Sequence, residues 1–264
     1  MKTKEAIDYL DGLFHPEYQE SYDNSGFLLG DSRGEYRGAL VALDLTTAVV
    51  AEAVAMGASL VVTHHPFIFT GVKRLTDGSE TGRMAMELIK NGICVYAAHT
   101  NLDNLPWGVN GMLCERLGLC NTRILKPFAT DATLGAGMVG ELAEPTDAES
   151  FLQKVKTVTG IPIIRTSTFS RQLSTIGLKR VAVCGGSGSE FIADALSAGA
   201  DIYLTADLKY HDFQRAGGRM LLADIGHYES EQFAREIIFR AISEKFCNFA
   251  CRISDAQKGI VCYI

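Results

Sequence analysis

One alternation of strand and helix patterns occurs twice along the chain, and no other feature constrains the fold as strongly. In the first half, ALVALD, SLVVT and ICVYAA have the pattern of short buried strands separated by helical stretches, and KRVAVC, DIYLT and RMLLADI repeat the plan in the second half. AMGASLVVT aligns with SAGADIYLT, and the same offset, from Thr63 to Thr205, places ALVA over VAVC. Strands that alternate with helices favour parallel sheets with right-handed crossovers. The sequence therefore predicts an α/β fold that contains two copies of one unit.

The length of 264 residues can fill two small domains. We predict two similar three-layer α/β lobes with mostly parallel sheets, an N-terminal lobe of residues 1–125 and a C-terminal lobe of residues 126–264. The last helix and strand could pack back on the first lobe. The stretch that begins the second lobe contains an alternating strand, GAGMVGELA, then a helix after Pro145, then IPIIRTS.

Composition excludes several classes of protein. The formal net charge of −6 argues against a nucleic-acid surface, because binding phosphates requires clustered Lys and Arg. No window approaches the roughly 18 apolar residues that a membrane span needs, and the N-terminus has the pattern of a charged helix rather than a signal peptide. The seven cysteines show no CxxC spacing and are interpreted as reduced core thiols. We therefore expect a cytoplasmic protein.

Metal-ligating side chains follow three of the predicted strands, where open α/β sheets gather their ligands. His64 and His65 follow SLVVT. Each half then ends its third strand with a histidine that a carboxylate follows four positions later, as in His99/Asp103 and His227/Glu231. On a helix, this separation places both side chains on one face. His99 and Asp103 are expected in a loop rich in Asn, Pro and Gly.

Imidazole and carboxylate ligands together suit Zn, Fe, Mn or Ni better than Ca or Mg. Four histidines and two carboxylates are too many for one tetrahedral ion, and two divalent ions about 3.5–4 Å apart would use them all. We therefore predict a metal pair at the interface of the lobes. Two carboxylates against two such ions leave a positive local charge, which favours an anionic ligand.

Weaker signals leave alternatives open. Asp207 occupies the repeat position of His65, and His211 lies one helical turn beyond it, so the two either serve the site or merely belong to a helix start. The segment CGGSGSE is typical of a phosphate-cradling turn but lacks the spacing and the lysine of a P-loop. There is no GxSxG elbow, Walker sequence or HExxH.

Seven motifs, in this order, resemble the Nif-three-like dinuclear metal-centre proteins, whose members bear the name GTP cyclohydrolase type 2 homologue. They are YDNSGFLLG, LDLT, VVTHHPFIF, AAHTNLDNLPWGVN, CGGSGS, TADLKYHDF and GHYESEQ, and they span nearly the whole chain. Departures from the family pattern are Tyr22 in place of a frequent Trp, Ala206 in place of a usual Gly, and the lack of an inserted domain between the halves.

The resemblance implies that the metal ligands are His64, His65, Asp103, His227 and Glu231, with His99 close by. It also implies two α/β halves around a central metal pair, assembled as a ring-shaped homohexamer with the sites facing an internal cavity.

Two functions are compatible with these residues. The first is a metal-dependent hydrolase that acts on a nucleotide or phosphoester, similar to a GTP cyclohydrolase, with His99, Asp207 and His211 available to move protons. The second is a ring-shaped scaffold that binds metal, nucleotide or a protein partner without turnover. Fold resemblance does not decide between them, because function depends on the site.

Overall fold

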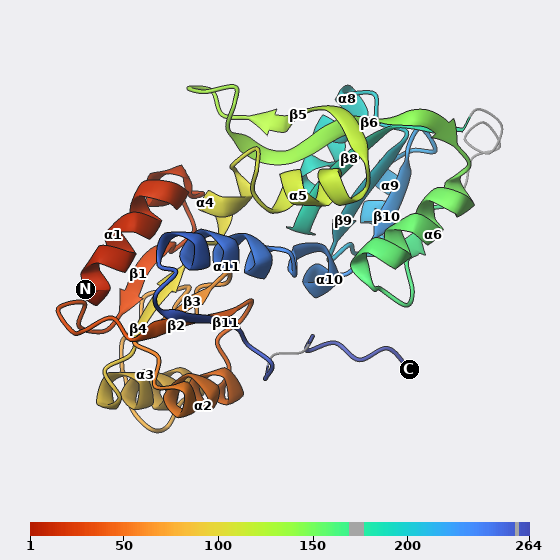
Figure 1. Cartoon of the computed structure of the whole chain (residues 1–264). Helices are drawn as coiled ribbons and strands as arrows, with labels where there is room; N and C mark the ends of the chain where they lie inside the picture. The colour runs from red at the N-terminus through yellow and green to blue at the C-terminus, as the bar shows by residue number, and fades with distance from the viewer. Residues whose placement is uncertain (169–176, 257–258) are drawn as a thin grey trace. The chain divides into compact units, whose positions relative to one another are not determined.

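The structure is a computed structural model that describes residues 1–168, 177–256 and 259–264. The chain forms two compact units, one of Met1–Leu102 with Ala234–Lys258 and one of Asp103–Phe233 with Gly259–Ile264. It leaves the first unit within the short helix α4 (Thr100–Asp103) and returns at α11 (Ala234–Lys245). Figure 1 labels these elements along the chain.

The sheet of the first unit has the strand order β1-β4-β3-β2-β11. The strands are β1 (Gly26–Leu29), β2 (Gly38–Ala42), β3 (Leu60–Thr63), β4 (Cys94–Ala97) and β11 (Ala250–Ile253). Four of them run parallel, and β1 pairs antiparallel with β4. The three middle strands β2, β3 and β4 are buried along their whole length, as expected for a parallel sheet covered on both faces.

Helices cover this sheet on both faces, with α2 and α3 on one side and α1 and α11 on the other (Figure 1). They are α1 (Thr3–Phe14), followed by the 3-10 turn η1 (Pro16–Tyr18), α2 (Thr47–Met56), α3 (Glu80–Lys90) and α11. The α2 helix begins where Thr46 accepts a hydrogen bond from the backbone of Val49 and ends at Gly57, which adopts a left-handed conformation. The alternation of strand side chains sends Leu40, Val61 and their neighbours toward α2 and α3.

The second unit contains a six-stranded sheet of order β5-β6-β8-β9-β10-β7. Its strands are β5 (Leu119–Pro127), β6 (Gly135–Thr146), β7 (Arg165–Thr166), β8 (Leu178–Ser187), β9 (Ile202–Ala206) and β10 (Leu221–Asp224). The strands β8, β9 and β10 are parallel, and antiparallel strands flank them on both sides.

Two apolar clusters fill the faces of this second sheet. Val181 and Val183 pack with α5 and α6, whereas Ala182 and Tyr203 pack with α8 and α9. The helices are α5 (Val109–Arg116), α6 (Ala148–Thr159), η2 (Ser189–Phe191), α8 (Ile192–Ser197), α9 (Asp212–Arg215) and α10 (His227–Glu231). The core therefore lies on both sides of β8, β9 and β10.

The predicted α/β fold is confirmed, and a parallel core of three successive strands recurs, as β2-β3-β4 and β8-β9-β10. The loop expected after His99 is instead the helical turn α4. Between β9 and β10, the chain is helical only over α9.

All seven cysteines are free thiols, but only part of the core-thiol prediction holds. Three are buried, whereas Cys120, Cys247 and Cys262 are exposed. Burial raises the pKa of the buried Cys94 and Cys114 thiols to about 11 and about 12, so these two are inert near neutral pH. Within the described residues, no helix is long and apolar enough to cross a membrane.

Candidate metal centre

Three histidines of the first unit converge beyond the ends of β3 and β4. His64 and His65 directly follow β3, and His99 follows the neighbouring strand β4, whose Ala97 pairs with Thr63. Each offers a ring nitrogen, and these nitrogens lie within 4.8 Å of one another. The sheet register therefore produces a cluster of three imidazoles, a donor set suited to a transition metal ion.

Carboxylates orient two of these imidazole rings. Nδ1 of His65 lies 2.7 Å from Oδ1 of Asp44, and Nδ1 of His99 lies 2.7 Å from Oδ1 of Asp23. An ionised carboxylate only accepts hydrogen bonds, so each Nδ1 carries the proton and donates it. Nε2 is then the nitrogen with a lone pair for a metal, which is the arrangement that carboxylates impose on metal-ligating histidines.

His64 has the same tautomer through a different partner. Its ring is buried, and Nδ1 donates to the backbone carbonyl of Ala98 at 2.7 Å. A carbonyl oxygen has no proton to give, so Nε2 of His64 is again the nitrogen that can ligate.

Asp23 connects this cluster to the N-terminal loop. Its side chain is fully buried and accepts hydrogen bonds from His99, from the backbone and hydroxyl of Thr100, from the backbone of Asn24 and from the hydroxyl of Ser25. Burial alone would raise the pKa of Asp23, but the hydrogen bonds and the charge of His99 outweigh it and hold the pKa far below its usual range. Asp23 therefore remains an ionised acceptor that fixes the ring of His99.

In the second unit, α10 carries a histidine and a carboxylate on one face. Nε2 of His227 lies 2.9 Å from Oε2 of Glu231, and Nδ1 of His227 lies 2.7 Å from Oδ2 of Asp207. Two ligands each about 2.1 Å from one ion and at right angles lie about 3 Å apart, so the His227 and Glu231 atoms fit the spacing of a shared divalent ion. Asp207, in a left-handed conformation at φ 56°, orients His227 as Asp44 orients His65.

The glycine-rich end of β8 packs against Glu231. A Cβ on Gly186 would lie 2.0 Å from Oε1 of Glu231, and the Gly186 amide donates to Oγ of Ser230 at 2.9 Å. Only glycine allows this approach. The end of β8 thus supports α10, and this packing accounts for its glycines.

Asp103 is the last residue of α4 and the first of the second unit. Its backbone carbonyl accepts from Nδ2 of Asn110 at 3.2 Å, while Oδ1 of Asn110 accepts from the Gly185 amide at 2.8 Å. Asn110 therefore links Asp103 to the glycine-rich end of β8, which packs against Glu231. Burial, and next the negative charge of Asp103, raise the pKa of the Cys184 thiol far above its usual value.

Two aspartates that orient the site histidines were not identified from the sequence. Asp23 and Asp44 bind His99 and His65, but they lie 76 and 21 positions away from them in the chain. A signal exists for Asp44, because it follows a strand adjacent to the strand that precedes His65. His211 is exposed at the start of α9, where its ring contacts that of Tyr210.

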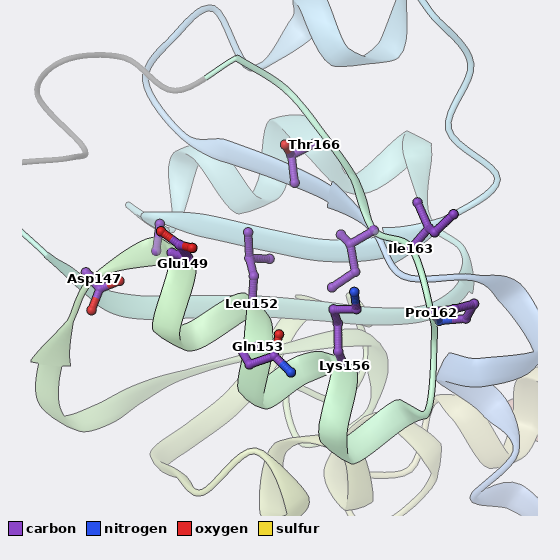
Figure 2. A pocket seen from close by; sticks show the side chains of 10 residues that line it. Asp147, Glu149, Leu152, Gln153, Lys156, Pro162, Ile163 and Thr166 are labelled. Carbon is purple, nitrogen blue, oxygen red and sulfur yellow. The ribbon is translucent and has the colours of Figure 1, made fainter.

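Two cavities of the second unit differ in chemistry. A groove of about 580 Å³ between α6 and residues 162–166 is lined by aliphatic, acidic and amide side chains and by Lys156, with neither histidine nor cysteine (Figure 2). A cavity of about 300 Å³ is lined in part by His227, Asp207, Arg165 and Tyr228. The second cavity therefore offers space for a ligand beside the α10 histidine.

The chain matches the family model described as Duf34/NIF3 (NGG1p interacting factor 3) over residues 1–259. The GTP cyclohydrolase 1 type 2 homolog of Clostridium perfringens is 35% identical over 234 residues, which are 88% of this chain and 87% of that protein. The crystal structure of a Staphylococcus aureus hypothetical protein has a TM-score of 0.89 and 29% identity, covering 100% of this chain and 99% of that one. A Bacillus cereus protein related to NIF3 has the same TM-score and coverage at 22% identity, which shows the fold alone. The chain therefore belongs to the Duf34/NIF3 family.

Proposed function

We propose that this protein holds two divalent metal ions per chain with His64, His65, Asp103, His227 and Glu231 as ligands, and that it is a metal-dependent hydrolase of a nucleotide or phosphoester. The observation that carries the proposal is the common state of the site histidines. His64, His65, His99 and His227 all donate Nδ1–H to an oxygen acceptor, which prepares Nε2 for a metal.

The donors that the two units contribute complement each other in charge. The first unit supplies an all-imidazole cluster, whereas Asp103 and Glu231 of the second unit supply negative charge. Two divalent ions need both, because imidazole is neutral as a ligand and two carboxylates offset half of the positive charge. The mixed donor set suits Zn, Fe, Mn or Ni. The short helix α4 directly follows His99 and ends on the proposed ligand Asp103.

A bound metal pair would supply an acidified water and would polarise an oxygen of the substrate. The residues of the chain do the rest. Asp23 holds the Nδ1 proton of His99, so Nε2 of His99 can accept a proton from a nucleophile. Asp207 holds His227 in position, and the exposed imidazole of His211 can exchange protons with solvent. The residual positive charge favours a small anionic or nucleotide ligand.

Elemental analysis of the purified protein, followed by a turnover screen, tests this function. The screen pairs each of Zn, Fe, Mn and Ni with GTP, nucleoside monophosphates and nitrophenyl phosphoesters. We expect about two ions per chain and hydrolysis of at least one compound. Two ions without turnover would contradict the hydrolase and favour a binding scaffold, whereas a metal-free protein that cannot be loaded would contradict the ligand set.

We further propose a homohexamer in the cytoplasm, which rests on the family pattern and on the seven free thiols. Light scattering under native conditions should give six times the 28.7 kDa mass of one chain. A monomer mass at micromolar concentration would contradict the assembly.

A further inference from the structure

Two aromatic side chains are exposed beside the histidine cluster of the first unit. Tyr22 is 58% exposed and Phe69 is 45% exposed, and their ring centroids lie 6.5 Å apart at an interplanar angle of 48°. The Phe69 ring centroid also lies 6.2 Å from that of His99, at 75°. Aromatic rings in water leave apolar surface that a ligand can bury.

Hydrogen bonds fix the loops that carry these rings. Nδ2 of Asn24 donates to the backbone carbonyl of Ile68 at 2.6 Å, which joins the two loops directly next to Tyr22 and Phe69. Asp23, between Tyr22 and Asn24, accepts the hydrogen bond of His99. The rings are therefore positioned in advance relative to a proposed proton-accepting histidine, and a ligand need not order them at full entropic cost.

We propose that Tyr22 and Phe69 form a stacking platform for a planar heteroaromatic ring of the ligand, with the anionic end of the same ligand at the histidines. This inference rests on the proposed function and narrows its substrate class. Phosphoesters in general need only the metal site, whereas a nucleobase or similar ring needs an aromatic surface within reach of it. Any such ring can stack on an aromatic side chain, so the platform provides affinity for a planar ring but little specificity for one base over another.

The surroundings favour a small ligand over a docked protein. The polar residues Asp23 and Asn24 directly follow Tyr22 in the chain, and neither ring belongs to the apolar core of the unit. Protein interfaces use contiguous apolar patches of several hundred Å². Tyr22 and Phe69 already contact each other, because their centroid distance of 6.5 Å lies within the range of about 4.5–7 Å over which aromatic rings interact. The pair therefore offers one small exposed aromatic surface, about the size of one planar group.

Calorimetry on the protein as purified, with four nucleoside monophosphates and ribose 5-phosphate as probes, tests the platform. We expect at least one nucleotide to bind at least about 5-fold more tightly than ribose 5-phosphate, because stacking supplies the difference. Phe69→Ala and Tyr22→Ala should weaken nucleotide binding by about 5- to 100-fold and leave ribose 5-phosphate binding unchanged. Tyr22→Phe should retain the preference. Phe27→Ala removes another exposed ring, on β1, and should have no effect.

Equal affinity for nucleotides and ribose 5-phosphate in the wild type would overturn the platform, as would full nucleotide affinity in the two alanine variants. A parallel loss of both ligands, or a change in oligomer mass, would also overturn it by assigning the rings to structure or assembly. Metal content measured on the same samples separates the two proposals. A metal-free protein that still prefers nucleotides over ribose 5-phosphate would support the platform and contradict the metal centre. A protein with two ions per chain and no such preference would support the metal centre and contradict the platform.

Discussion

Replacing Glu231 by alanine should lower the metal content of the purified protein from about two divalent ions per chain to one or none. Glu231 is buried, lies 2.9 Å from Nε2 of His227 and packs against Gly186 at the end of β8. No exposed carboxylate could replace it in that enclosed position. Loss of an anionic ligand also leaves more of the positive charge of the ions uncompensated, because the remaining imidazole ligands are neutral, and this weakens the binding of a divalent ion.

Inductively coupled plasma mass spectrometry after extensive dialysis measures this result. Glu229→Ala is the matched control, because it removes the same charge from the same helix and should leave the metal content unchanged. Glu231→Gln keeps the shape of the side chain beside Gly186, so it separates loss of the ligand from damage to the packing. Equal metal content in the wild type and in both Glu231 variants would remove Glu231 from the ligand set.

The parallel core of each sheet could be predicted from the sequence because its central strands are buried on both faces. Such strands appear as short continuous apolar runs, and ICVYAA and DIYLT became β4 and β9 for this reason. The short helices were less predictable. α4 carries the turn-forming Asn101 near its start, yet the side chain of Asn101 accepts from the backbone of His99 and donates to Phe14 instead of ending the helix. Phe14, which accepts this hydrogen bond, lies 87 positions away in the chain, so the local sequence pattern does not reveal the contact.

The candidate ligands were more predictable than the residues that orient them. Histidines and carboxylates after strands are visible in the sequence, and parallel strands bring their ends together. Which carboxylate holds which imidazole depends on tertiary distances. Asp207 was a candidate for catalysis because of its repeat position, and the structure shows it on Nδ1 of His227. Asp44 holds Nδ1 of His65 in the same way. Asp44 was given no role from the sequence, because it lies among apolar residues.

Replacing His65 by alanine should remove metal first, whereas replacing His211 should reduce turnover and leave metal in place. His65 belongs to the three-imidazole cluster, with Nδ1 held by Asp44, so its loss subtracts a ligand. His211 is exposed at the start of α9 and belongs to none of the described groups of metal-ligating atoms. Loss of a proton carrier costs about 10²–10⁴ in rate, while loss of a ligand empties or distorts the site.

The two variants are measured together, for metal content and for turnover of whichever compound the wild type hydrolyses. His15→Ala is the matched control, because His15 pairs with Glu17 at the protein surface and should leave both quantities unchanged. A His211→Ala variant with wild-type turnover would restrict proton transfer to His99, whose ring Asp23 already orients. A His211→Ala variant that loses metal as completely as His65→Ala would instead place His211 among the ligands, and the proposed division between ligand and proton carrier would then be wrong.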